Sequence, residues 1–139
     1  MLQIIIFSFN RAMQLDTLLR SVYKHFKFDN YQVGVLYNTS NRDFEKGYDL
    51  LKGKYPQVEF VKESTNKDHF GIKDAMCFYN LKKIIKHKQL RNAKSDFRSL
   101  LCGMLHGNAD CSMFLTDDSA FYSDVCLTDD IFSWVNEKP

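Results

Sequence analysis

Two adjacent carboxylates, Asp117 and Asp118, are the residues of this sequence whose type and position best suit ligand chemistry. They directly follow Met113, Phe114 and Leu115, an apolar run with the length and composition of a buried strand. In open α/β sheets, ligands bind at the carboxyl ends of the strands, where paired carboxylates can hold a hard divalent cation while a diphosphate supplies further oxygen ligands. Asp is also common in turns, so a solvated turn or the cap of a following helix is the alternative interpretation.

The first 62 residues predict alternating strands and helices. Apolar segments predict strands at 2–9, 31–37 and 58–61, and the first, which contains three consecutive isoleucines, is expected to be central in a parallel sheet. Helical spacing is shown by Leu15, Leu18, Leu19, Val22, Tyr23 and Phe26, and again by Phe44, Tyr48, Leu51 and Tyr55. Right-handed crossovers make a doubly wound sheet the natural result of this order.

The second part of the chain is less regular. Residues 63–71 are polar, 72–90 predict one or two helices, and Ser95 could cap a helix that ends near Gly107. Its inward face would carry Leu100, Leu101, Met104 and Leu105. A strand follows at 111–116, and Thr128 could cap a last helix. The predicted fold class is therefore α/β, a three-layer α/β/α sandwich around a mainly parallel, doubly wound sheet.

The sequence shows no internal repeat, low-complexity tract or linker, so residues 1–139 predict a single domain. A doubly wound sheet normally has further strands beyond the last predicted helix. We therefore expect a chain truncated before a second, acceptor-binding half.

Composition excludes several classes of partner. The net charge is +2, from 19 basic and 17 acidic residues, which gives no electrostatic case for nucleic acid. The basic residues between 82 and 91 alternate with apolar ones at near-helical spacing and predict a solvated helix face. No apolar run approaches the roughly 20 residues that span a bilayer. The four cysteines have no CxxC or zinc spacing, and we expect small core residues in a reducing, cytoplasmic compartment.

Several common catalytic motifs are missing from the sequence. It contains no GxxxxGK[ST], GxGxxG or GxSxG pattern, which argues against P-loop, dinucleotide-binding and α/β-hydrolase enzymes. The four histidines form no HxxxH or His/Cys pattern, so metal binding through histidine is not expected.

The remaining pattern resembles a known family. FSFNR with the following QLDTLLRSV, the strand end YNTS, and FLTDDSAFY are similar, in order, to the nucleotide-binding N-terminal half of a GT-A fold glycosyltransferase of the family-two type. The most specific element is the acidic DxD-type motif after a strand. The resemblance implies a nucleotide-diphospho-sugar donor, Mn²⁺ or Mg²⁺, and transfer of the sugar to a hydroxyl acceptor.

The resemblance also implies residue roles. Asp117 would lie by the ribose, and Asp118 would coordinate the metal that bridges the diphosphate. Ser119 stands where many relatives have a third acid, which leaves fewer negative ligands for the ion. Contacts at or near the nucleotide would come from Ser8, Phe9, Asn10, Arg11, Asn38, Asp96 and Arg98.

Most of these contacts have a plainer alternative. Residues 8–11 also suit a helix-entry turn, and Asp96 and Arg98 suit the exposed first turn of a helix. Asn38 stands where the family usually has an acid, so the identity of the base stays open. Inverting relatives take their general base from the second half, so we expect it beyond Pro139 and name no catalytic residue here.

Two other functions remain open at this stage. One is a non-catalytic sugar-nucleotide-binding domain. The other is a regulatory Mg²⁺-binding α/β module of the receiver type, although receivers also place acids at the end of the first strand, where this chain has FSFN. We expect residues 1–139 alone to transfer no sugar.

Overall fold

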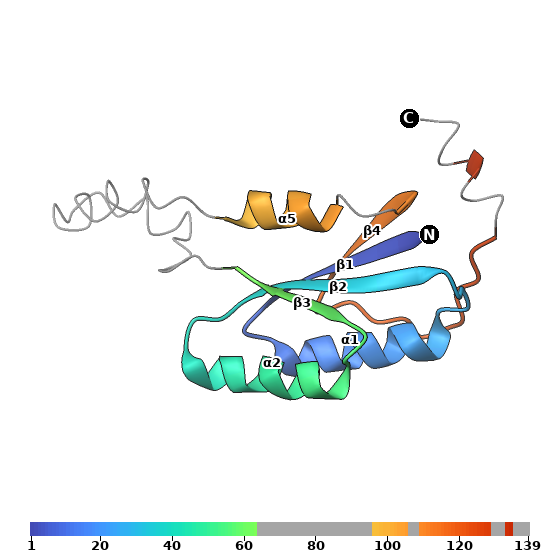
Figure 1. Ribbon diagram of the computed structural model, residues 1–139. Coiled ribbons are helices and arrows are strands. Elements are labelled where there is room, and N and C mark those ends of the chain that lie inside the picture. The colour runs from blue at the N-terminus through green and yellow to red at the C-terminus, as the bar shows by residue number, and fades with distance from the viewer. Residues whose placement is uncertain (64–95, 106–108, 129–132, 135–139) are drawn as a thin grey trace, which may run out of the picture.

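The computed structural model describes residues 1–63, 96–105, 109–128 and 133–134 (Figure 1). Its elements are β1 (Leu2–Phe9), α1 (Ala12–His25), β2 (Tyr31–Asn38), α2 (Arg42–Lys54), β3 (Glu59–Lys62), α5 (Phe97–Leu105) and β4 (Cys111–Thr116). The helices predicted over 72–90, the cap at Ser95 and the stop at Gly107 lie outside the described residues, as does most of the last predicted helix.

The four described strands form one all-parallel sheet in the order β3-β2-β1-β4. β1 pairs along its whole length with β2 and from Leu2 to Phe7 with β4. The prediction of one parallel sheet with the first strand at its centre is therefore confirmed. The chain leaves β1 toward β2 and β3 on one side, and β4 is added on the other. The boundary between β1 and β4 is thus the topological switch point, where open α/β sheets bind ligands.

Helices cover both faces of the sheet, which confirms the predicted three layers. α1 and α2 lie on one face and α5 on the other (Figure 1). The larger core lies beneath α1 and α2, where Ile4 and Ile6 of β1 pack against Leu15, Leu18 and Leu19 of α1. A smaller cluster under α5 contains Ile5, Leu36 and Met104. Alternate residues of β1 therefore serve opposite layers, as the period of a strand requires.

Three expectations about burial were wrong. Phe114 is 50% exposed and Leu105 37% exposed, although both were expected to face inward. β4 is an edge strand of the described sheet, and the apolar contacts of α5 are centred on β1 and β2, so Phe114 lies at the margin of that layer. Cys102 and Cys126 are exposed, so these two thiols are not core residues, whereas the half-buried Cys111 packs against the larger core; Cys77 lies outside the described residues. Within the described part of the chain, no helix combines the length and apolarity needed to cross a membrane.

The close approach of α1 and α2 can be tested at two glycines of α2. A Cβ at Gly47 would come within 2.8 Å of the Ala12 Cβ, whereas one at Gly53 would meet nothing within 4 Å. Gly47→Ala should therefore lower the free energy of unfolding by about 1–3 kcal/mol through overpacking. Gly53→Ala should raise it by roughly 0.5–1 kcal/mol, because alanine is the better helix former. Denaturant unfolding measures both, and equal stabilisation by both would contradict the packing.

Candidate functional site

A cavity of about 590 Å³ opens at the carboxyl ends of the strands, with α5 on its far side. Its polar lining comes from Ser8, Arg11, Asn38, Glu63, Thr116, Asp117 and Asp118. Its apolar lining comes from Phe7, Phe9, Leu36 and Phe97. The cavity therefore coincides with the switch point between β1 and β4 and extends past the end of β2 to the residue after β3.

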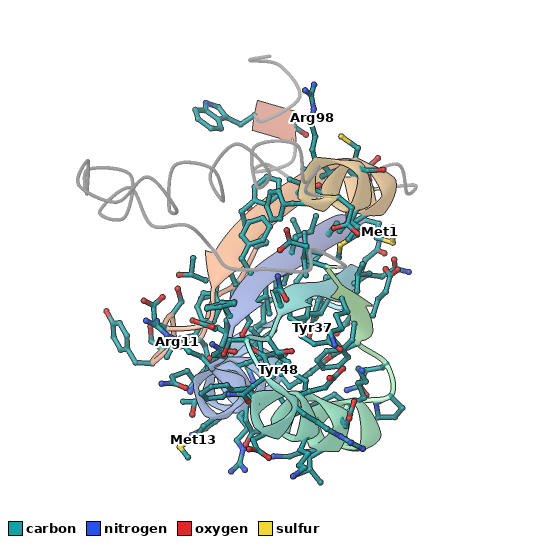
Figure 2. The ribbon with its side chains drawn as sticks, turned by 90° about the vertical axis from the view of Figure 1, so that its left-hand side faces the viewer. Met1, Arg11, Met13, Tyr37, Tyr48 and Arg98 are labelled. Carbon is teal, nitrogen blue, oxygen red and sulfur yellow. The ribbon has the colours of Figure 1, made fainter. Side chains whose placement is uncertain are left out.

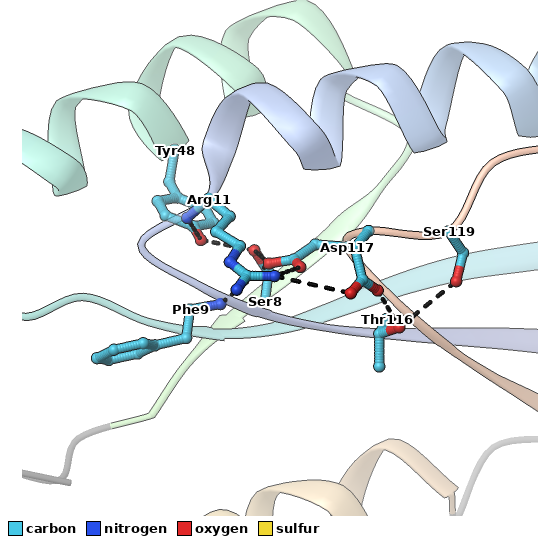
Figure 3. Close-up of polar contacts among 8 residues, drawn as sticks. Ser8, Phe9, Arg11, Tyr48, Thr116, Asp117 and Ser119 are labelled. Atoms are coloured by element: carbon cyan, nitrogen blue, oxygen red, sulfur yellow. Dashed lines mark hydrogen bonds and ion pairs between the residues drawn. The ribbon is translucent and has the colours of Figure 1, made fainter.

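Asp117 is the buried centre of this site, at 5% exposure. Its Oδ2 accepts a hydrogen bond from the Ser8 hydroxyl at 2.8 Å and one from the Phe9 N–H at 3.3 Å (Figure 3). The Asp117 N–H donates to the carbonyl of Phe7 at 3.1 Å. These contacts hold the end of β4 against the end of β1. Asp117 is thus no solvated turn residue, although the turn itself exists, closed by the Ser119 N–H donating to the Thr116 carbonyl.

The hydroxyl of Tyr48 extends this network into α2. It lies 2.6 Å from the Ser8 Oγ and accepts from the Arg11 N–H at 3.1 Å (Figure 3). Because the single hydrogen of Ser8 goes to Asp117, Tyr48 must donate to Ser8. Burial makes the largest contribution and raises the pKa of Tyr48. The hydrogen bond with Ser8 lowers this pKa, whereas the negative charge of Asp117 raises it. Tyr48 therefore stays a protonated donor.

Asp118 is the exposed member of the pair, with 63% of its side chain accessible. The Thr116 hydroxyl donates to its Oδ1 at 2.5 Å, and this bond, aided by the charge of Arg11, lowers the pKa of Asp118. The Arg11 Nη1 lies 3.6 Å from the Asp117 Oδ1 and 3.7 Å from the Asp118 Oδ2. One guanidinium thus neutralises part of the charge of both carboxylates, one buried and one facing solvent.

The side chain of Asn10 joins two of the turns that border the site. It has a φ of 58°, a left-handed conformation that Asn tolerates better than most residues. Its Nδ2 donates to the Ser40 Oγ at 2.9 Å and its Oδ1 accepts from the Ser40 N–H at 2.8 Å. These two bonds join the turn after β1 to the turn after β2. Asn41, in the second of these turns, caps α2, because its Oδ1 accepts from the N–H groups of Asp43 and Phe44.

A second buried carboxylate was missed by sequence reasoning. Glu63 directly follows β3, is 8% exposed and lines the cavity. Its backbone N–H donates to the Tyr37 carbonyl at 2.8 Å, and its Oε2 accepts from the Asn38 Nδ2 at 3.2 Å. The signal available in the sequence was an acid just beyond a short strand, the same signal that identified Asp117.

The structure brings most of the predicted residues together. Six of the nine line the same cavity, namely Ser8, Phe9, Arg11, Asn38, Asp117 and Asp118. Asn10 is bonded to Ser40 instead. Asp96 and Arg98 lie at the start of α5 outside the lining, and Figure 2 shows Arg98 near the top of the view, well apart from Arg11. Their roles toward a ligand stay predictions.

The segment after the acidic pair is fastened to α1. The Phe121 N–H donates to the Ser21 Oγ at 3.0 Å, and Val125 forms an isolated parallel bridge with Phe26. Asp124 lies 2.9 Å from the His25 Nδ1. The turn that carries Asp118 is therefore held from both sides, by β4 before it and by α1 after it.

Sequence similarity relates part of this chain to a short part of a larger protein. No protein-family model matches the chain. Among curated proteins, it is 38% identical over 74 residues to the bifunctional glycosyltransferase pgtA of Dictyostelium discoideum. The match covers 48% of this chain and 10% of that protein. The similarity supports a relationship to glycosyltransferases, while the chain corresponds to only a tenth of the relative.

The hydroxyl of Tyr48 offers a test of the buried network. Tyr48→Phe leaves the Arg11 N–H and the Ser8 Oγ without this partner, so the free energy of unfolding should fall by about 1–3 kcal/mol. The control is Tyr122→Phe, the same change at a residue that is 93% exposed, which should stay within about 0.5 kcal/mol. Equal stability of the two variants in denaturant unfolding would contradict the network.

Proposed function

We propose that this chain is the nucleotide-diphospho-sugar-binding part of a metal-dependent glycosyltransferase that transfers a sugar to a hydroxyl acceptor. One observation carries the proposal: Asp117 and Asp118 meet the end of β1 at the switch point of the sheet and face a cavity. The similarity to a glycosyltransferase supports it independently.

The cavity suits a ligand of this size and chemistry. Its volume of about 590 Å³ lies within the range of roughly 300–1,000 Å³ typical of small-molecule sites. Phe9 and Phe97 are 40% and 38% exposed, so their rings can pack against a base or a sugar. Polar groups from several strand ends converge on the same space, which is the arrangement that orients a polar ligand.

Asp117 and Asp118 suit a divalent ion only if the bound donor supplies further oxygen ligands. Asp118 is exposed and ionised, whereas Asp117 already accepts from Ser8 and Phe9. Among the described residues, no group of three or more His, Cys, Asp and Glu side chains could hold a metal. In this proposal Asp118 holds Mn²⁺ or Mg²⁺ together with diphosphate oxygens and water. When bound, the ion would offset the charge that develops on the departing nucleoside diphosphate.

The neighbouring residues then take distinct parts. Asp117 accepts a ribose hydroxyl with an oxygen that is fixed in place by Ser8 and the Phe9 N–H. The guanidinium of Arg11 is 52% exposed and within 4 Å of both acids, so it can pair with diphosphate oxygens as the donor enters. We assign no general base to the described residues.

A non-catalytic sugar-nucleotide binder would use the same geometry. The end of β1 carries Ser8 and Phe9, without the acids of a phosphate-accepting receiver, which favours a nucleotide ligand over the regulatory alternative. Donor hydrolysis or sugar transfer by a longer form of the chain would separate an enzyme from a binder.

Asp118→Asn tests the metal role. The variant removes a negative charge beside the proposed ion and keeps the size of an exposed side chain, so the fold should be unaffected. We expect the affinity for UDP or GDP in Mn²⁺ to fall by more than tenfold, which is about 1.4 kcal/mol, with little change in the absence of metal. Isothermal titration calorimetry with and without Mn²⁺ measures both, and Mn²⁺ without nucleotide should bind weakly.

Two further variants serve as comparisons for Asp118→Asn. Asp29→Asn makes the same change in charge at an exposed residue near the amino end of β2, and it should leave the affinity unaltered. Asp117→Asn should weaken nucleotide binding with a smaller metal dependence and should also lower stability, because Asp117 is buried. If Asp118→Asn leaves the metal-dependent affinity unchanged, the metal role of Asp118 is wrong, and the two carboxylates serve only to form the turn after β4.

A further inference from the structure

We propose that Arg11 sets the order in which the two ligands of this cavity bind: its guanidinium holds Asp118 until a nucleoside diphosphate draws it away, so a divalent ion binds after the nucleotide. The inference rests on the proposed function, because it assumes that the cavity takes a nucleoside diphosphate and that Asp118 holds the ion. To the pairing of Arg11 with diphosphate it adds competition between Arg11 and the ion.

The guanidinium of Arg11 faces one oxygen of each acid. On Asp117, Oδ2 accepts two hydrogen bonds from β1, and Oδ1 lies 3.6 Å from the Arg11 Nη1. On Asp118, Oδ1 accepts from the Thr116 hydroxyl, and Oδ2 lies 3.7 Å from the same nitrogen. Figure 3 marks these contacts with dashed lines. An ion held by the Asp118 Oδ2 and the guanidinium would therefore compete for one oxygen.

The contacts of Arg11 make this exchange easy. Both distances from Nη1 are longer than a hydrogen bond, and the side chains of Arg11 and Asp118 are 52% and 63% exposed. Ion pairs with exposed partners contribute little to stability, because water and salt screen them. The backbone N–H of Arg11 is bonded to the hydroxyl of Tyr48, so the main chain stays in place when the guanidinium moves.

The charge of Arg11 opposes a divalent ion at Asp118. One guanidinium offsets the charge of one of the two acids, and it also repels a second cation placed beside it. A diphosphate changes this balance. Its oxygens form charge-assisted, bidentate pairs with a guanidinium, and they are ligands for the ion as well. Once Arg11 turns to the diphosphate, Asp118 can bind the ion.

A purely structural role for Arg11 is the alternative, because the buried Asp117 benefits from the same charge. The two roles predict different effects when the charge is removed. If Arg11 only supports the turn, its loss lowers stability and strengthens the binding of no ligand. If Arg11 excludes the ion, its loss strengthens the binding of Mn²⁺ alone and weakens the binding of nucleotide.

The experiment is calorimetric titration of Mn²⁺ alone, and of UDP and GDP in EDTA, into the full chain and into Arg11→Gln. The variant should bind Mn²⁺ alone at least about fivefold more tightly than the wild type, since a unit charge about 4 Å from a divalent ion matters to this degree even in water. It should bind UDP or GDP without metal at least about tenfold more weakly, since the charge-assisted pair with the diphosphate is lost.

Three further variants serve as controls. Arg20→Gln makes the same change at an exposed arginine that pairs with Asp16 of the same helix, and it should alter neither affinity. Arg11→Lys keeps the positive charge and should bind Mn²⁺ alone nearly as weakly as the wild type. Adding Asp118→Asn to Arg11→Gln should abolish the gain in Mn²⁺ affinity, because the gain comes through Asp118.

A measurement on the wild type decides the matter if Arg11→Gln fails to fold. The Nε–H signal of Arg11 in ¹H–¹⁵N NMR spectra should shift when UDP or GDP binds in EDTA, because the guanidinium leaves the acids for the diphosphate. A bound nucleotide that leaves this signal unshifted would overturn the exchange. So would a folded Arg11→Gln that binds Mn²⁺ alone no more tightly than the wild type.

The two proposals fail in different ways. Suppose that UDP or GDP binds in Mn²⁺ and loses affinity in Asp118→Asn, but Mn²⁺ alone binds Arg11→Gln no more tightly. Then the binding site stands, and the competition between Arg11 and the ion is wrong. If neither nucleotide binds to the wild type in Mn²⁺, both proposals are wrong.

Discussion

The burial of one ionised side chain, Asp117, is the constraint on which this end of the molecule depends. A carboxylate removed from water costs several kcal/mol unless hydrogen bonds and opposite charge replace the lost hydration. Here the Ser8 hydroxyl and the Phe9 N–H supply the hydrogen bonds, and Arg11 supplies the charge. The ends of β1 and β4 therefore cannot separate without exposing or orphaning these groups.

The same requirement reaches the helices behind the sheet. The Ser8 hydroxyl donates its only hydrogen to Asp117. Its oxygen can still accept a hydrogen bond, and the hydroxyl of Tyr48 in α2 donates it. Tyr48 is placed by stacking on Tyr37 of β2, with ring centroids 4.4 Å apart. The chain of contacts thus runs through three strands and α2. It makes the rim of the cavity stiff, while Asp118 and Arg11 remain exposed and able to change partners.

Much of this arrangement followed from local sequence patterns. Isoleucine-rich β1 and the spacing of Leu15, Leu18 and Leu19 predicted a central strand and its covering helix, because periodicity is a property of neighbouring residues. The strand-end rule for open α/β sheets then predicted that Asp117 and Asp118 would lie at the carboxyl edge of the sheet, and the family resemblance implied that Ser8 and Asn38 would lie near a ligand there.

Other features depend on contacts between distant segments and could not be predicted locally. The helical spacing identified Tyr48 only as a residue of an apolar helix face. It gave no indication that the Tyr48 hydroxyl bonds to Ser8, which lies 40 positions away in the chain. The bonds between Asn10 and Ser40 depend on a left-handed backbone that the sequence does not display. The exposure of Phe114 depends on β4 being at an edge, and the place of Glu63 depends on where β3 ends.

The central claim is that a nucleoside diphosphate and a divalent ion bind together at the ends of β1 and β4. Paramagnetic broadening of amide NMR signals by Mn²⁺, recorded with and without UDP or GDP, tests it most directly. We predict strong broadening at Phe9, Asp118 and Ser119 that requires the nucleotide and is lost in Asp118→Asn. Broadening centred on other acidic residues, or the same broadening without nucleotide, would contradict the claim.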